Sequence, residues 1–510
     1  MAVTAASPGD VREAPQSWVQ AVAERVARVH VAAWLTLVGI VVFTVVFGRL
    51  GVIHHNNFGS WAYDLGIYDQ GFWLVSRGGQ SFVTVRGLEF WGHHVNLVAL
   101  LFAPFYWLGA GPSFLYVVQA FVLGLGALPV YLIARDRFQR PWIGLTFAVA
   151  YLMYAPLQWI TSANFHPEAL VVTPLLFAWF FARRRSWGWY FVSLGLALST
   201  REDVALAVFM LGVVLAVLYW RSDGRRDLYA AFGTMFIGFA WYVICTQVAI
   251  PYFNDGRQPF YLEYFYGSYG GTFPEIAQTM ARHPDQLVRD VTQPDRLQFY
   301  RDLVLPFGGL PLAAPLELLM VLPQLLASAI GSSPYARSIR YQYTAVMIAP
   351  ITIAAIEGAR WLWGRFRVVR VGLIPWVLVW AYVTNVAWSP SPIGTGYDVA
   401  WLRENPRQAT LEAAVETVPD DVSVTATYGL LPHLSHREQI YNWPNPFVMS
   451  YWGNDDDYRL PDPSTIEYVV VDRQQVGTTD QQLLADLIDG DPYEILFDQE
   501  DVVVARRVAP

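Results

Sequence analysis

The sequence has a single cysteine, Cys245, and no lysine, so all 34 of its basic residues are arginine. One cysteine excludes a disulfide framework and a metal site built from several cysteines. Charged residues are scarce, at 15% of the 510 positions, whereas hydrophobic residues make up 54%. This balance argues against an ordinary soluble chain and indicates a polytopic membrane protein. The net charge of -8 argues against nucleic acid as a partner.

The N-terminal residues 1–31 are polar and contain arginine, and they lack the short apolar core and cleavage site of a signal peptide. Apolar runs close to membrane-spanning length then follow at 32–52, 113–134, 141–159, 168–182, 187–200, 203–220, 229–250, 342–361 and 371–388. Arginine clusters separate several of these runs, at Arg135/Arg137/Arg140, Arg183/Arg184/Arg185, Arg221/Arg225/Arg226 and Arg360/Arg365/Arg367/Arg370. Because arginine favours cytoplasmic loops, we predict these clusters and residues 1–31 on the inside.

The arginine clusters also limit how often the chain crosses the membrane. Residues 1–31 and Arg135 are both predicted inside, so the apolar run 94–109 is not expected to span. Gly308-Gly309, Pro311 and Pro315 interrupt the run 303–331, which predicts two short helices that cross twice or not at all. The expected fold is a polytopic α-helical membrane domain over 32–389, with about eleven transmembrane helices in the cytoplasmic (inner) membrane. External loops with juxtamembrane helices are expected at 54–112 and 251–302.

The composition changes from residue 390 to residue 510, where prolines, carboxylates and short alternating runs replace the apolar blocks. Alternating residues predict strands at 422–427, 467–471 and 501–505. Amphipathic spacing predicts helices at 402–418 and 479–488. We therefore expect a small, soluble α/β domain outside the membrane, which could orient a polymeric acceptor.

Two carboxylates in the first external loop, Asp64 and Asp69, lie among aromatic residues. Either could act as a general base that takes a proton from an acceptor hydroxyl. Residues five positions apart lie about 140° apart on an ideal helix, so both cannot face one pocket if both are helical. The alternative is structural, with Asp64 as a helix cap and Asp69 as a solvated acid. The sequence leaves open which of them is catalytic.

The segment Asn164-Phe-His-Pro-Glu168 falls at a predicted outer end between two apolar runs. His166 and Glu168 could join His93 and His94 in binding a divalent cation, although their spacing matches no known metal signature. A structural interpretation also suffices, because Pro167 can begin a helix and an acid in its first turn suits the helix dipole. No cofactor is therefore certain, and a divalent cation is the one candidate.

Three consecutive charges, Arg201-Glu202-Asp203, interrupt a long apolar stretch at the predicted outer face. An arginine there can bind a lipid phosphate in bidentate fashion, and Arg337 and Arg340 are further candidates. The structural alternative is a turn whose arginine extends to the membrane surface.

Several of these motifs together resemble a known family. They are Tyr63-Asp-Leu-Gly-Ile-Tyr-Asp-Gln70, Phe165-His-Pro-Glu-Ala169, Arg201-Glu-Asp203, Tyr341-Gln-Tyr343 and Leu430-Leu-Pro-His-Leu-Ser-His-Arg437. In this order, from about residue 33 to about residue 445, the chain is similar to the bacterial and archaeal membrane proteins of the DUF2079 family. That family resembles the C-type (GT-C) glycosyltransferases, which use polyprenyl-phosphate sugars.

The resemblance implies an acid in the first external loop, at Asp64 or Asp69, and substrate contacts from the other motifs. The substrate-binding candidates are Tyr68, Gln70, His94, Arg201, Glu202, Asp203, Arg340, Tyr341 and Tyr343, and the cation candidates are His93, His166 and Glu168. The implied activity is an inverting transfer from a polyprenyl-phosphate sugar to a cell-envelope glycan, lipid or protein at the outer face of the membrane. The alternatives are a transporter or flippase of lipid-linked intermediates and a non-catalytic protein of envelope assembly.

Overall fold

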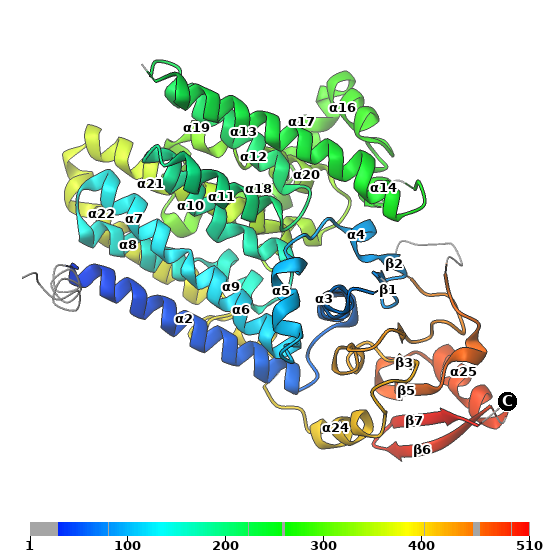
Figure 1. Ribbon diagram of the computed structural model, residues 1–510. Helices are drawn as coiled ribbons and strands as arrows, with labels where there is room; N and C mark the ends of the chain where they lie inside the picture. Colours follow the sequence, from blue (N-terminus) through cyan, green and yellow to red (C-terminus); the bar gives the residue numbers. More distant parts are fainter. Residues whose placement is uncertain are drawn as a thin grey trace, which may run out of the picture.

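The computed structural model describes residues 29–79, 81–222, 224–257, 261–401, 403–451, 459–490 and 492–508. Most of the predicted cytoplasmic segment 1–31 lies outside these residues. A bundle of helices forms one part of the molecule, and the C-terminal residues form a sheet at its other end (Figure 1).

Each predicted apolar run is helical in the structure. The bundle helices are α2 (Val31–Asn56), α6 (Pro112–Leu125), α7 (Ala127–Phe138), α8 (Pro141–Leu152), α9 (Ala155–Ser162), α10 (Val172–Arg183), α11 (Trp187–Leu198), α12 (Val204–Tyr219), α13 (Arg225–Ile244), α21 (Ala345–Arg365) and α22 (Arg367–Trp388). By length and composition, 5 helices of the described chain can cross a membrane: Val31–Asn56, Pro112–Phe138, Arg225–Phe253, Gln342–Arg365 and Arg367–Trp388. The number of possible spans rises to 6 if the bent pair α8 and α9 counts as one span.

The remaining apolar helices are shorter than a membrane-spanning helix. α10 and α11 have 12 residues each and α12 has 16. The run 94–109 forms only the short helix α5 (Ala99–Tyr106), as predicted. Residues 303–331 form η4 (Leu305–Phe307), η5 (Leu310–Ala313), α19 (Pro315–Leu318) and α20 (Leu322–Ile330), which are too short to span. The count of about eleven spans therefore stays a prediction.

Three of the four arginine clusters are linked by direct contacts at one end of the bundle, and the fourth begins beside them. Arg184 pairs with Asp136 at 2.7 Å, and Arg137 pairs with Glu357 at 2.7 Å. Arg360 donates a hydrogen bond of 3.0 Å to the carbonyl of Arg137. Arg185 pairs with Asp227, which directly follows Arg225 and Arg226. All four clusters therefore lie on one side, as the sequence predicted.

The segment between α2 and α6 forms short elements at the opposite end of the bundle. They are the π-helix η1 (Ala62–Gly66), α3 (Ile67–Arg77), the antiparallel pair β1 (Phe82–Val83) and β2 (Leu88–Glu89), α4 (Phe90–His93) and α5. The later loop contains η3 (Cys245–Ala249), α14 (Ile250–Phe253), α15 (Tyr261–Tyr266), α16 (Phe273–Arg282), α17 (Pro284–Val291) and α18 (Pro294–Val304). Three single turns, η2 (Pro167–Val171), η6 (Tyr335–Arg337) and η7 (Gln342–Thr344), lie between the longer helices.

The tail begins with α23 (Tyr397–Ala400) and forms a five-stranded sheet of order β4-β3-β5-β7-β6. Its strands are β3 (Val424–Ala426), β4 (Ile440–Asn442), β5 (Tyr468–Asp472), β6 (Tyr493–Gln499) and β7 (Val502–Arg507), with β3 parallel to β4 and β5. Alternate residues of β5 and β7 face opposite cores, as the period of a strand requires. One core includes α24 (Gln408–Glu416), and the other includes α25 (Thr478–Asp489).

The sheet and the first loop share one hydrophobic core. Val424, Val470 and Val504 of the sheet belong to the same cluster of buried residues as Leu65 and Phe72 of η1 and α3. The single turn η8 (Leu431–His433) packs on η1 so closely that a Cβ on Gly66 would lie 2.7 Å from Leu431 Cδ2. The tail is therefore built into the loop at the end of the bundle and does not stand apart from it.

Helices α12 and α13 pack backbone against backbone at two glycines. A Cβ on Gly212 would lie 2.7 Å from the backbone nitrogen of Met235, and a Cβ on Gly238 would lie 2.7 Å from the carbonyl oxygen of Ala205. A Cβ on Gly233 of the same α13 would meet nothing within 4 Å. The close approach thus depends on the two contact glycines.

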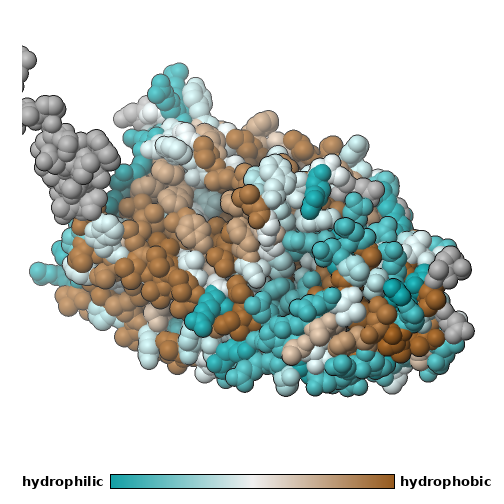
Figure 2. All heavy atoms as spheres, turned by 60° about the horizontal axis from the view of Figure 1, so that its bottom comes forward, coloured by the Kyte–Doolittle hydropathy of each residue, from teal (hydrophilic) through white to brown (hydrophobic). Residues whose placement is uncertain are grey.

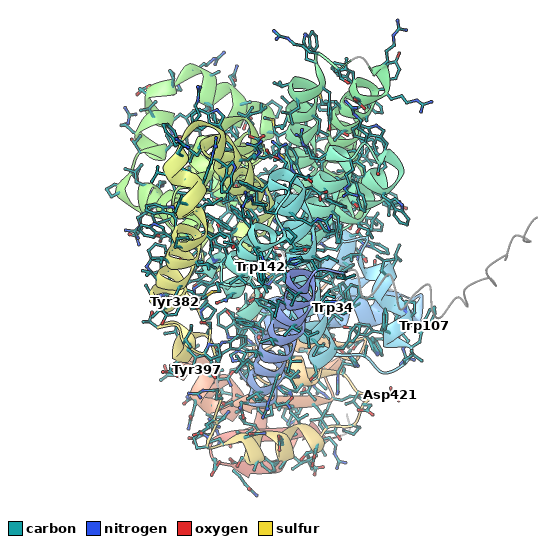
Figure 3. All side chains as sticks on the ribbon, turned by 90° about the vertical axis from the view of Figure 1, so that its left-hand side faces the viewer. Trp34, Trp107, Trp142, Tyr382, Tyr397 and Asp421 are labelled. Atoms are coloured by element: carbon teal, nitrogen blue, oxygen red, sulfur yellow. The ribbon has the colours of Figure 1, made fainter. Side chains whose placement is uncertain are left out.

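The flank of the bundle is apolar. Figure 2 shows hydrophobic side chains gathered over one half of the visible face and hydrophilic ones over much of the other. On α2, Val38, Val41, Val42 and Val45 are exposed. Trp34, Trp142 and Tyr382 lie on the outside of α2, α8 and α22 (Figure 3), as expected for side chains that contact lipid.

Candidate active site

The first contact of the site joins the loop between α2 and α6 to the segment after α9. Asp64 in η1 lies 3.2 Å from His166, measured from Oδ1 to Nε2. The Asp64 side chain is 23% exposed, whereas His166 is buried. The structure therefore places a partly exposed carboxylate against a fixed imidazole, which is a geometry suited to proton transfer.

Helix α6 holds His166 in place. Its residue Gln119 accepts a hydrogen bond of 3.0 Å from the His166 backbone N–H, and Tyr116 donates one of 2.8 Å to Asn164 Oδ1. The Asn164 carbonyl lies 2.6 Å from Nδ1 of His166, and because a carbonyl only accepts, Nδ1 carries a proton. Burial opposes the charged form, but Asp64 raises the pKa of His166 above its ordinary value, which favours the imidazolium.

Arg201 occupies a second, buried cluster. Its Nε lies 2.8 Å from Asp203 Oδ1, and its Nη2 lies 2.5 Å from Oδ2 of the same carboxylate. Its Nη1 pairs with Glu168. Burial alone would lower the pKa of Arg201, but Asp203 and Glu168 raise it well above the ordinary value. All three guanidinium nitrogens are thus engaged by carboxylates.

Glu202, which follows Arg201 in the chain, connects the turn between α11 and α12 to the segment before α5. It lies 2.7 Å from Nδ1 of His94 and accepts a hydrogen bond of 3.1 Å from the backbone N–H of Val95. Burial would raise the pKa of Glu202, but His94 and Arg201 lower it to about 2. Glu202 and His94, both predicted substrate contacts, therefore form a buried pair in this structure.

Tyr68 and the segment from His166 to Glu168 connect these clusters. The ring of Tyr68 lies 5.7 Å from that of His166, and burial followed by the charge of Glu168 raises the pKa of Tyr68. His166 contacts Asp64, and Glu168, two positions further along, contacts Arg201, so this short segment links Asp64 to Arg201. Tyr341 packs edge-on against Tyr335 with ring centres 5.0 Å apart, and Tyr343 lies in η7.

Asp69 has a different environment. It is 0% exposed, accepts hydrogen bonds of 2.7 Å from Tyr106 and 2.6 Å from Ser435, and lies 3.0 Å from Nε2 of His436. Burial would lower the pKa of His436, but Asp69 raises it. Asp64 and Asp69 thus contact different partners, and Asp69 joins α3 to the tail.

Two more of the predicted substrate contacts have distinct surroundings. Gln70 is buried, donates a hydrogen bond of 2.8 Å to Thr84 and accepts one of 3.2 Å from the Val85 backbone, so it connects α3 to the loop that follows. Arg340 is exposed, with its guanidinium carbon 5.1 Å from the centre of the Trp159 ring. Arg337 pairs with Asp295 at 2.9 Å.

The predicted cation ligands do not form one cluster. His166 contacts Asp64, Glu168 contacts Arg201, and the ring of His93 lies 4.4 Å from that of His94, tilted by 43°. Among the described residues, no group of three or more His, Cys, Asp or Glu side chains is placed to hold a metal ion. A divalent cation stays a prediction.

Sequence reasoning missed the residues that hold His166 and Asp69 in place. Gln119 and Tyr116, which bond to the His166 backbone and to Asn164, lie within an apolar helix, where a single polar residue gives little signal. Ser435 and His436 belong to the motif at residues 430–437, which was identified in the sequence. Nothing in their spacing indicates that they contact Asp69, which lies 366 positions before Ser435.

Comparisons with known proteins agree with this architecture. The DUF2079 family, described as predicted membrane proteins, matches residues 54–504. The crystal structure of ArnT from Cupriavidus metallidurans bound to undecaprenyl phosphate has a TM-score of 0.53 at 14% identity, over 93% of this chain and 98% of that one. The structure of ArnT from the same organism in the apo state has a TM-score of 0.53 at 15% identity, over 94% and 99%. Among curated proteins, no sequence matches.

The likeness to ArnT covers most of both chains and shows a shared fold. The match to the family model confirms the DUF2079 family predicted from the motifs, and the likeness to ArnT shows that this chain shares the fold of that protein.

Proposed function

This chain belongs to the DUF2079 family of predicted membrane proteins, and from that premise we propose that it is a membrane glycosyltransferase whose donor is a polyprenyl-phosphate sugar. The fold shared with ArnT supports this proposal, since one ArnT crystal structure contains undecaprenyl phosphate. The acceptor is a cell-envelope glycan, lipid or protein, and the reaction takes place at the outer face of the cytoplasmic membrane. The N-terminus is inside, the tail is outside, and the short apolar helices complete the crossings.

The contact between Asp64 and His166 carries the proposal. Asp64 is the general base: its carboxylate takes the proton of an acceptor hydroxyl while that oxygen attacks the anomeric carbon. The bond from the anomeric carbon to the phosphate oxygen breaks, and attack from the opposite face inverts the configuration. His166 holds the Asp64 carboxylate in position from a distance of 3.2 Å. Asp69, which is fully buried, is a structural residue in this proposal.

Arg340 is the best candidate to bind the phosphate that leaves. It is exposed, and among the described residues no carboxylate lies within ion-pair distance of it. Arg201 was the first candidate by sequence, but its three nitrogens contact Asp203 and Glu168. We therefore assign Arg201 to holding the site together and Arg340 to stabilising the negative charge that grows on the phosphate.

The remaining predicted contacts surround this centre. Tyr68, Tyr341 and Tyr343 border the region between Asp64 and Arg201 and offer hydroxyl groups to a sugar. Glu202 and His94 fix the loop that closes it.

The test uses purified protein in nanodiscs with a panel of radiolabelled polyprenyl-phosphate sugars, and it scores release of sugar from the lipid. We expect turnover by the wild type, loss of turnover in Asp64→Asn, and weaker donor binding in Arg340→Gln. Arg367→Gln, at the opposite end of the bundle, is the matched control for the lost charge and should behave as wild type. No turnover of any donor, together with lipid translocation in vesicles, would replace this proposal with a transporter.

A further inference from the structure

Three aromatic residues form a surface next to the proposed base, and we call Trp61, Tyr63 and Tyr428 the aromatic platform. The ring centres of Trp61 and Tyr428 are 6.5 Å apart with 37° between their planes. Tyr63 meets Tyr428 edge-on, at 5.6 Å and 89°. Trp61 is 46% exposed, whereas Tyr63 and Tyr428 are half-buried, so the open face of the platform is mainly that of Trp61.

The platform is assembled from two distant parts of the chain. The Ala62 backbone N–H donates a hydrogen bond of 3.1 Å to the carbonyl of Tyr428, and the Tyr63 hydroxyl donates one of 2.8 Å to the carbonyl of Ser450. The first loop thus supplies Trp61 and Tyr63, and the tail supplies Tyr428. These backbone contacts fix the rings relative to one another.

The platform borders Asp64. Tyr63 precedes Asp64 in η1, and burial followed by the charge of Asp64 raises the pKa of Tyr428. Because Tyr63 and Asp64 are adjacent in η1, a molecule that lies on these rings is next to the segment that contains the proposed base.

An exposed aromatic face of this kind suits a sugar. The face of an aromatic ring is electron-rich, and the C–H bonds on one side of a pyranose present a weakly positive, apolar surface that packs on it. The hydroxyl groups at the edge of the sugar stay available to the base and to solvent.

A lipid contact explains the platform less well than a sugar does. Trp34, which is 44% exposed, projects from the flank of a bundle helix (Figure 3), where aromatic residues contact lipid. Trp61, by contrast, lies beyond the end of α2, and its neighbour Tyr428 comes from the tail.

We infer that the aromatic platform binds a sugar ring of the acceptor, so that the acceptor of this protein is a saccharide. The inference rests on the proposed function, because it takes Asp64 as the base. It assigns recognition of the acceptor to residues from the first loop and the tail, and recognition of the donor phosphate to Arg340.

The experiment measures binding of linear oligosaccharides of glucose, galactose, mannose and N-acetylglucosamine, printed as an array, to the intact protein in nanodiscs. We expect at least one series to bind. Trp61→Ala should raise Kd about tenfold or more, which corresponds to ~1.4 kcal/mol. Trp61→Phe should restore most of the affinity because it keeps a ring. Trp34→Ala, matched in exposure, should bind as wild type.

Two results would overturn the inference: no binding of any oligosaccharide by the wild type, or equal affinity in wild type and Trp61→Ala. Release of sugar from the donor lipid is measured on the same preparations and tests the proposed function alone. Donor turnover without oligosaccharide binding would reject the platform and keep the transferase. Binding that depends on Trp61 without turnover of any donor would keep the saccharide site and reject the transferase.

Discussion

Asp64 and Asp69 are five positions apart in one segment, yet their surroundings assign them different roles. Asp64 has one strong partner and remains partly exposed, so it can reach a hydroxyl group of a bound substrate. Asp69 has three partners and no exposure, so its oxygen atoms are already used. Their spacing of five positions turns the two side chains to different sides of the helical segment.

The first prediction separates these roles by substitution. Asp64→Asn should lower turnover by a factor of about 10² to 10⁴, the usual contribution of a general base, with little change in melting temperature. Asp69→Asn should lower the melting temperature, because the amide nitrogen that replaces one oxygen cannot accept the hydrogen bonds of Tyr106, Ser435 or His436. Turnover and melting temperature are measured on both variants in the same detergent. The reverse pattern would make Asp69 the base.

A second prediction concerns pH. Asp69 raises the pKa of His436 in the folded protein above the unfolded value of about 6.5. The stability that protonated His436 contributes is therefore complete below that unfolded pKa and is lost as pH rises through the raised folded pKa. The difference in melting temperature between wild type and His436→Gln should be larger at about pH 5.5 than at about pH 9. A difference that stays constant or grows with pH contradicts the ion pair.

At the scale of elements, apolar runs of the sequence located the bundle helices well. Helix α2 covers the run 32–52, and α22 covers 371–388, because an unbroken apolar stretch in a membrane has to satisfy its backbone by forming a helix. The lengths were harder to predict. The run 168–182 directly follows Pro167, and its first residues form the 3₁₀ turn η2 before α10, which shortens the helix to 12 residues.

A third prediction concerns the contact of α12 with α13. Gly238→Ala should destabilise the protein by about 1–3 kcal/mol, because the new Cβ would overlap backbone atoms of α12 that cannot move away easily. Gly233→Ala on the same helix is the control and should be neutral or stabilise by up to about 1 kcal/mol. Thermal unfolding of both variants checks this. Equal effects would show that the two helices do not approach as closely as described.

At the scale of the whole molecule, the tail and the first loop form one structure. Leu431 lies in the core that joins η1 to the sheet, and it is fully buried. Leu431→Ala should cost about 2–5 kcal/mol. Amide hydrogen exchange should then speed up together in α3 and in β3, although they lie far apart in sequence. Faster exchange in the tail alone would contradict a shared core.

How much could be predicted from the sequence depended on whether a property was local. The motifs around Asp64, His166 and Arg201 identified the family, and in the structure His166 contacts Asp64 while Glu168, from the same segment, contacts Arg201. The sequence could not show that Arg201 is engaged by Glu168, or that Asp69 is closed off by Ser435 and His436. Those contacts depend on three-dimensional packing between segments that no periodicity connects.

Ser435 and Asp69 are in contact but lie 366 positions apart in the chain, so the ribosome makes Asp69 well before Ser435. At about 5–20 residues per second, the ribosome needs roughly 20 to 70 s to add that many residues. During this interval the first loop has already left the ribosome while the tail that covers its apolar side chains does not yet exist. Newly made chains therefore pass through a period in which this loop is open to proteases and chaperones. If translation stops before the tail is made, the loop stays uncovered.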